Sequence, residues 1–77
     1  MNIEKAIEKL NELAVRCKET HTDAVEGNWY REAERRWNEA TAVYRGAKEM
    51  LEVLGFEVTR EEVGNGKYSH TVKEIQE

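Results

Sequence analysis

The chain has 77 residues, a formal net charge of −4 and a charged fraction of 36%. This length suits one small domain, residues 1–77, of the kind that oligomerisation often stabilises. The overall acidity argues against direct binding to DNA. No apolar run is long enough for a membrane span or a signal peptide, and the single cysteine, Cys17, excludes an internal disulfide. We therefore expect a cytoplasmic protein that does not bind membranes.

The first part of the chain has the apolar spacing of an amphipathic helix. Apolar residues recur every three or four positions, at Ile3, Ile7, Leu10, Ala14 and Cys17. This period predicts a first helix over about residues 2–25, with Gly27 ending it and Asn28 capping the next helix. An alternative would end the first helix near Thr20 and begin the second at Asp23, but the heptad continues past Thr20 and favours the longer helix.

A second helical stripe predicts a helix over about residues 29–54, which Gly55 ends. Its apolar members are Trp29, Ala33, Trp37, Ala40, Tyr44, Ala47, Leu51 and Leu54. Two long helices joined by a tight connection predict an antiparallel helical hairpin.

The period changes to two over about residues 56–74, which predicts a C-terminal two-stranded β-hairpin around Gly64-Asn65-Gly66. A two-residue Asn-Gly loop would pair residue 63 with 68 and scatter the apolar side chains. A three-residue loop pairs 63 with 67, places Glu57 across from Lys73 and gathers the apolar residues on one face. We favour this second register because register follows the buried face, whose members are Phe56, Val58, Tyr68 and Val72. The predicted fold class is α+β.

Arg36 interrupts the second stripe. At about 100° per residue it projects within roughly 20° of Trp29, so we expect it to be buried and paired with an acid, an aromatic face or a ligand. His21, Trp29 and Trp37 should gather beside it near the helical turn. With Tyr44, this cluster would suit a nucleotide or another flat anion. The structural alternative is that Arg36 pairs with Glu19 or Asp23 and closes the core.

A basic stripe should lie on the outer face of the second helix, away from the tryptophans. It consists of Arg31, Arg35 and Arg45, with Glu34, Glu39 and Glu49 interspersed. It is either a solvated face of mixed charge or an electrostatic surface for docking on a partner.

A minor face of the second helix carries Ala42, Gly46 and Val53. Glycine inside a helix costs up to about 1 kcal/mol relative to alanine, so close approach of another backbone would explain it. We expect either the β-hairpin or a second subunit to pack there.

Catalytic and metal chemistry find little support in the sequence. Cys17 lies on the apolar seam, as a core residue would. His21 and His70 have no neighbouring residues at ligand spacing, so we expect no metal and no cofactor. The carboxylates are dispersed along helix faces, and we expect a protein that is not an enzyme.

Segments of the second helix and the first strand resemble small accessory proteins of phages and mobile elements in Gram-positive bacteria. They are residues 37–40, 44–47, 50–51 and 54–58, with sequences WNEA, YRGA, ML and LGFEV. The resemblance implies a bacterial cytoplasm and an accessory role, such as inhibition of host defence.

The sequence thus favours a non-enzymatic binding protein that docks on a host protein and inhibits it. The alternative is an oligomer that sequesters a nucleotide-like anion, and a third possibility is a purely structural oligomerisation module. The expected partners are a host protein or a small anionic ligand, together with a second copy of the chain.

Overall fold

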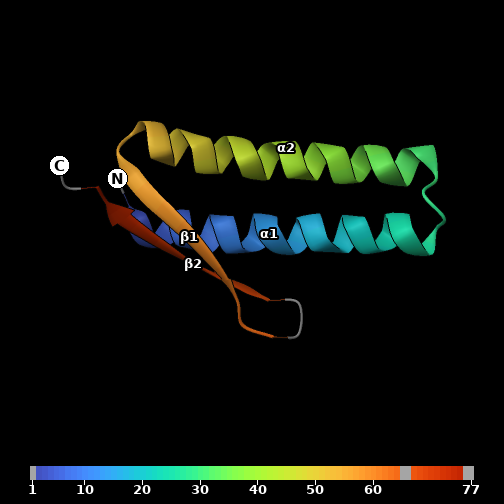
Figure 1. Ribbon diagram of the computed structural model, residues 1–77, viewed down its shortest axis with the longest axis horizontal. Coiled ribbons are helices and arrows are strands. Elements are labelled where there is room, and N and C mark those ends of the chain that lie inside the picture. The colour runs from blue at the N-terminus through green and yellow to red at the C-terminus, as the bar shows by residue number, and fades with distance from the viewer. Residues whose placement is uncertain (1, 65–66, 76–77) are drawn as a thin grey trace.

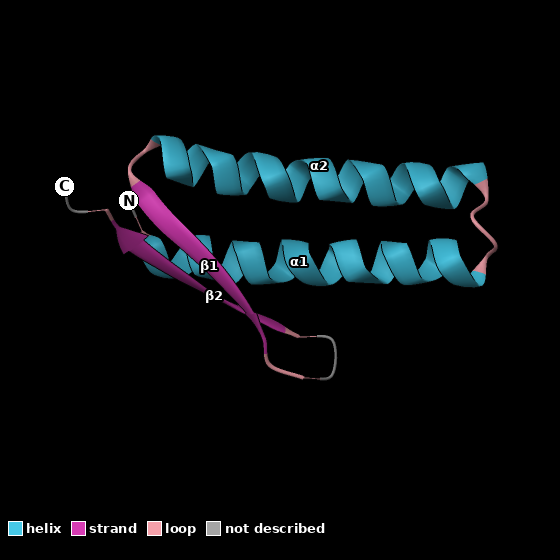
Figure 2. Cartoon of the chain, in the orientation of Figure 1, coloured by secondary structure: helices cyan, strands magenta, loops and turns pink. Residues whose placement is uncertain are grey.

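The structure, a computed structural model, describes residues 2–64 and 67–75. Two long helices, α1 (Ile3–Glu26) and α2 (Arg31–Val53), precede two strands, β1 (Phe56–Glu62) and β2 (Tyr68–Glu74). The helices lie antiparallel and side by side, and the strands cross them obliquely at the end that holds both termini (Figure 1). Figure 2 shows the same order by type of element. The predicted α+β architecture is confirmed.

The first helix has the longer of the two predicted lengths, but the turn that follows it differs from the prediction. α1 runs to Glu26, and the Gly27 amide donates to the Asp23 carbonyl at 2.8 Å, so Gly27 ends the helix as expected. Asn28, however, does not cap α2. Asn28 and Trp29 have φ angles of 59° and 58°, in the left-handed region, and α2 begins only at Arg31. The turn therefore needs two left-handed residues that the helical period could not reveal.

The other helix ends follow ordinary capping chemistry. At the start of α1, the Asn2 side chain accepts a hydrogen bond of 3.1 Å from the Lys5 amide, a cap that the sequence analysis did not identify. At the end of α2, Gly55 has φ +92°. A residue with a side chain would be strained there, which explains why the helix gives way to the strand at a glycine.

The predicted strand register is confirmed. Glu57 lies across from Lys73, and the Val63 amide donates to the Lys67 carbonyl at 3.1 Å. Asn65 and Gly66, on which the turn prediction partly rests, lie outside the described residues.

The core lies between the helices and under the strands. Its buried members are Leu10, Leu13, Ala14, Tyr44, Leu51, Val58 and Val72. β2 packs on α1 and β1 packs on α2, so each strand contributes one valine to a shared cluster. The predicted face of the hairpin therefore faces the helices, but it also carries His70, which is only 3% exposed.

His70 is held by one residue from each helix. The Tyr44 hydroxyl lies 2.8 Å from Nε2, and the Asn11 Oδ1 lies 2.6 Å from Nδ1. An amide oxygen can only accept, so Nδ1 of the neutral ring donates to Asn11 and Nε2 accepts from the Tyr44 hydroxyl. Burial, and then the cations Arg60 and Lys48, lower the pKa of His70 and keep it neutral.

The minor face of α2 is not covered by the hairpin. Val53 is 82% exposed, and no atom lies within 4 Å of a side-chain carbon built on Gly46. The expectation that the β-hairpin packs on this face is wrong, because the strands cross on the side that carries Tyr44 and Leu51.

Tyr44→Phe should lower the free energy of unfolding by about 1–3 kcal/mol, because the buried Nε2 of His70 loses its donor. Tyr30, which is 70% exposed, provides the matched control, and Tyr30→Phe should stay within about 0.5 kcal/mol of wild type. Urea unfolding followed by tryptophan fluorescence measures both. Equal stability of the two variants would show that the hydroxyl–imidazole bond contributes nothing.

The free energy of unfolding should also fall as the pH is lowered. The unfolded chain protonates His70 near the ordinary histidine pKa of 6.5, whereas the folded pKa is lower, so the folded state binds fewer protons between the two values. The contribution is complete above 6.5 and is lost as the pH falls through the folded pKa. Between about pH 7.5 and pH 5.5, unfolding free energies should drop for wild type and for His21→Gln, but not for His70→Gln. A His70→Gln slope equal to that of wild type would refute this assignment.

Candidate functional site

The narrow sheet leaves the helical layer partly uncovered. Paired strands lie about 4.8 Å apart, whereas packed helices lie about 8–10 Å apart, so one ribbon crossing obliquely cannot cover both helices. On the α2 side, a groove of about 580 Å³ remains. We call it the cationic groove. It is lined by Cys17, Trp37, Thr41, Tyr44, Arg45, Lys48 and Arg60.

Three of the residues that line the cationic groove are cations, and none is acidic. Arg45 forms no ion pair within the described part of the chain, and Lys48 reaches Glu52 only at 4.0 Å. The Arg60 guanidinium lies 5.8 Å from the centre of the Tyr44 ring and 5.1 Å from that of Tyr68. Arg45 and Arg60 therefore form no ion pair with a carboxylate of the described residues and are available to an anion, and Lys48 is held only by its long contact to Glu52.

The groove also offers a flat apolar wall and a polar atom without a partner. Trp37 is half-buried and Tyr44 is buried. The Thr41 hydroxyl oxygen is buried and makes no hydrogen bond to the described residues. A buried polar atom without a partner is costly, so this oxygen can gain from a bound molecule or water.

The aromatic cluster predicted near the helical turn is present. The His21 ring lies 4.8 Å from that of Trp37 and 5.5 Å from that of Trp29, and the two indoles are 5.5 Å apart. Trp29 remains 45% exposed. Because Trp37 belongs both to this cluster and to the cationic groove, the cluster supports the aromatic wall of the groove.

The expectation for Arg36 is wrong. Its side chain is 62% exposed and pairs with Glu32 at 2.9 Å, not with Glu19 or Asp23. The angular argument used Trp29 as a reference, but Trp29 precedes α2. Measured from the buried residues of α2, Arg36 lies about 60° from the centre of the apolar face, where a long side chain reaches water.

The predicted basic stripe divides between two places. Arg31 and Arg35 line a shallow hollow that also contains Glu34 and Glu39. Arg45 lies instead in the cationic groove. Because acidic residues are interspersed around Arg31 and Arg35, this part of the stripe matches a solvated face of mixed charge, one of the two alternatives expected from the sequence.

The sequence analysis missed four residues of the groove, one of which, Cys17, it assigned to the core. Lys48 lies one turn after Tyr44, and Thr41 one turn after Trp37, so helical spacing could have placed both beside the aromatic wall. Arg60 lies across from His70 in the sheet, on the face of Val58. The alternation of β1 contained that signal, but the contact with α2 is tertiary and no local pattern predicts it.

Other kinds of site find no support within residues 2–64 and 67–75. No three His, Cys, Asp or Glu side chains there could hold a metal ion together. Neither helix in this part of the chain has an apolar stretch that could cross a membrane. Comparisons of the chain with protein-family models, with curated proteins and with solved structures found no match.

Arg36→Ala should change the free energy of unfolding by no more than about 0.5 kcal/mol, because an exposed ion pair one helical turn apart contributes little. Trp37→Ala should cost about 3 kcal/mol or more, since it removes the ring shared by the cluster and the groove. Parallel urea titrations of the two variants test this contrast. A large loss for Arg36→Ala would restore the buried role expected from the sequence.

Proposed function

We propose that the protein is a non-enzymatic binding protein that holds a nucleotide-like anion in the cationic groove. One observation supports this function best. Arg45, Lys48 and Arg60 surround one aromatic-walled groove that no acidic residue lines. A volume of about 580 Å³ lies within the range of small-molecule sites.

Each part of the groove suits one part of such a ligand. The two guanidinium groups and the Lys48 ammonium suit phosphate oxygens, which accept charge-assisted hydrogen bonds. The Trp37 ring suits a flat base, since stacking on an aromatic side chain stabilises bound bases by about 1–3 kcal/mol.

The resemblance to phage accessory proteins stays a prediction, and it suggests a biological role for this binding. A phage protein that sequesters a nucleotide signal would inhibit host defence without catalysis. Inhibition by direct docking on a host protein, and assembly with a second copy, are also proposals. The mixed charge around Arg31 and Arg35 supports docking there less than the cationic groove supports an anion.

Two matched double variants test the site. Arg45→Gln with Lys48→Gln removes two positive charges from the groove, and Arg31→Gln with Arg35→Gln removes two from the hollow on the same helix. Isothermal titration with ADP should show binding by wild type. The groove variant should bind about tenfold more weakly or worse, and the hollow variant should bind within about twofold of wild type.

Adenosine and inorganic phosphate separate the two halves of the ligand. Both should bind more weakly than ADP, because adenosine contacts only the aromatic wall and phosphate contacts only the cations. Equal loss in both double variants would indicate non-specific attraction to positive charge and refute the site. Absence of ADP binding, with no retained nucleotide in native mass spectra, would refute the proposed function.

A further inference from the structure

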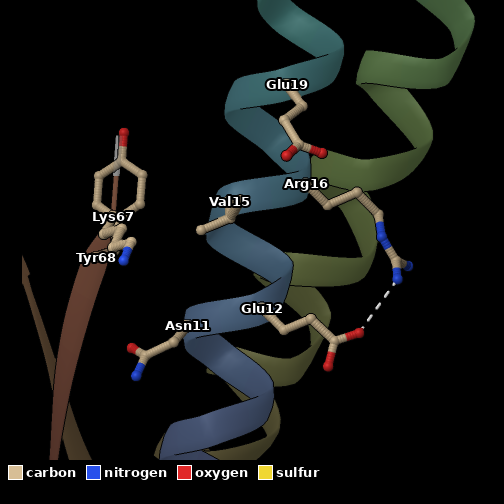
Figure 3. Close-up of a pocket in the computed structure, with 7 residues that line it drawn as sticks. All are labelled: Asn11, Glu12, Val15, Arg16, Glu19, Lys67 and Tyr68. Atoms are coloured by element: carbon tan, nitrogen blue, oxygen red, sulfur yellow. Dashed lines mark hydrogen bonds and ion pairs between the residues drawn. The ribbon is translucent and has the colours of Figure 1, made fainter. Parts of the chain in front are cut away.

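A second groove lies on the other side of the ribbon, between α1 and β2. It has a volume of about 510 Å³ and is lined by Asn11, Glu12, Val15, Arg16, Glu19, Lys67 and Tyr68. Figure 3 shows Asn11 and Val15 projecting from α1 toward the strand, with Tyr68 across the gap. Arg16 points away and pairs with Glu12 at 3.3 Å. We call this the strand-edge groove.

The strand beside this groove has a free edge. In the ladder, Val63 bonds to Lys67 and the Ile75 amide donates to the Gly55 carbonyl, so the odd-numbered residues of β2 bond to β1. The backbone groups of Tyr68, His70 and Val72 therefore point outward, and they make no hydrogen bond to other described residues. Such an edge is a template for one more strand.

The two edges of the ribbon differ in charge. β1 carries Glu57, Arg60, Glu61 and Glu62 among its seven residues, and charged side chains protect an edge from pairing. β2 has the sequence YSHTVKE, with charges only at Lys73 and Glu74. An added strand is therefore favoured along β2 and not along β1.

The wall that an added strand would face is acidic with an apolar centre. At about 100° per residue, three glutamates lie within roughly 60° of the direction that Asn11 and Val15 share. They are Glu4, Glu8 and Glu19, and none forms an ion pair within the described part of the chain. Lys18 lies on the same side but pairs with Glu62 at 3.3 Å, and Lys67 lines the groove at its strand side, so the unpaired charge of the helix wall is negative. Val15 and the Tyr68 ring supply the apolar part. The Asn11 oxygen is engaged by His70, whereas the Asn11 amide nitrogen makes no hydrogen bond to the described residues and can donate to a partner.

We propose that the strand-edge groove binds an extended, basic segment of a partner protein, which adds to β2 as a third strand. Backbone hydrogen bonds to His70 and Val72 fix its position, its lysine or arginine side chains meet the glutamates of α1, and an apolar residue covers Val15. A second copy pairing through its own β2 fits poorly, because two-fold symmetry would bring identical rows of glutamates together. This surface is separate from the cationic groove and does not depend on the anion.

A peptide of seven residues, blocked at both ends, is the probe, and its length matches β2. Lysine and valine occupy the alternate positions that face α1, and threonine occupies the others, because successive side chains of a strand point to opposite faces. Added to ¹⁵N-labelled full-length protein, it should shift the amide signals of Tyr68, His70 and Val72 and slow their hydrogen exchange. The same peptide N-methylated at alternate residues cannot donate to a strand and should bind about tenfold more weakly or not at all.

Charge is tested with paired variants that each remove two exposed glutamates. Glu8→Gln with Glu19→Gln should weaken binding of the lysine–valine peptide about tenfold, and Glu34→Gln with Glu49→Gln on α2 should leave it within about twofold. The proposal is overturned if the peptide does not bind at millimolar concentration, if the N-methylated peptide binds as tightly, or if the two double variants lose affinity equally. Concentration-dependent dimerisation without peptide, with the same β2 amides protected, would assign the edge to a second copy instead.

Discussion

The contact between the ribbon and the helices depends on a chain of two hydrogen bonds, a buried one from Tyr44 to His70 and a partly buried one from His70 to Asn11. A two-stranded ribbon has too little apolar surface to be stable alone, so it must be fixed to another layer. Val58 and Val72 contribute apolar contacts that do not depend on orientation, whereas the imidazole needs one hydrogen-bond partner at each nitrogen. The observed placement of β2 over both helices provides both partners. The polar residue thus specifies the position of the sheet, and the valines stabilise it.

The same placement creates both grooves. A ribbon anchored through His70 runs obliquely over a wider helical layer, and it leaves one uncovered strip on each side. The strips differ in charge because only cations are charged in the lining of one, whereas the lining of the other mixes Glu12 and Glu19 with Arg16 and Lys67. By helical spacing, the unpaired Glu4 and Glu8 continue the α1 flank beside this second groove. A chain with a net charge of −4 therefore has one groove lined by cations and no acidic residue, on the opposite side of the ribbon from a flank with unpaired glutamates. Net charge alone would have suggested neither surface.

The sequence was sufficient to predict the features that depend on the spacing of apolar residues and on the chemistry of turns and helix ends. Both helices, the stop at Gly27 and the strand register follow from apolar spacing and turn residues, and the structure confirms them. The position of Arg36 could not be predicted, because it depends on where α2 begins, and that is decided by two left-handed residues at 28 and 29. Arg60 was missed for another reason. Arg60 lines the groove only because β1 packs over Tyr44. This contact joins residues 16 positions apart, and no period of the sequence predicts it.

The incomplete outer layer also bears on the stability of so small a domain. Folding buries a smaller fraction of the surface in a short chain, which leaves stability marginal. Any molecule that binds only the folded state adds to that stability by mass action. A strand beside β2 would cover Val15 and satisfy the outward backbone of His70 and Val72, and an anion between Arg45 and Arg60 would offset the repulsion among the cations. A partner of the kind proposed for either groove would therefore stabilise the folded chain by the same contacts that bind it.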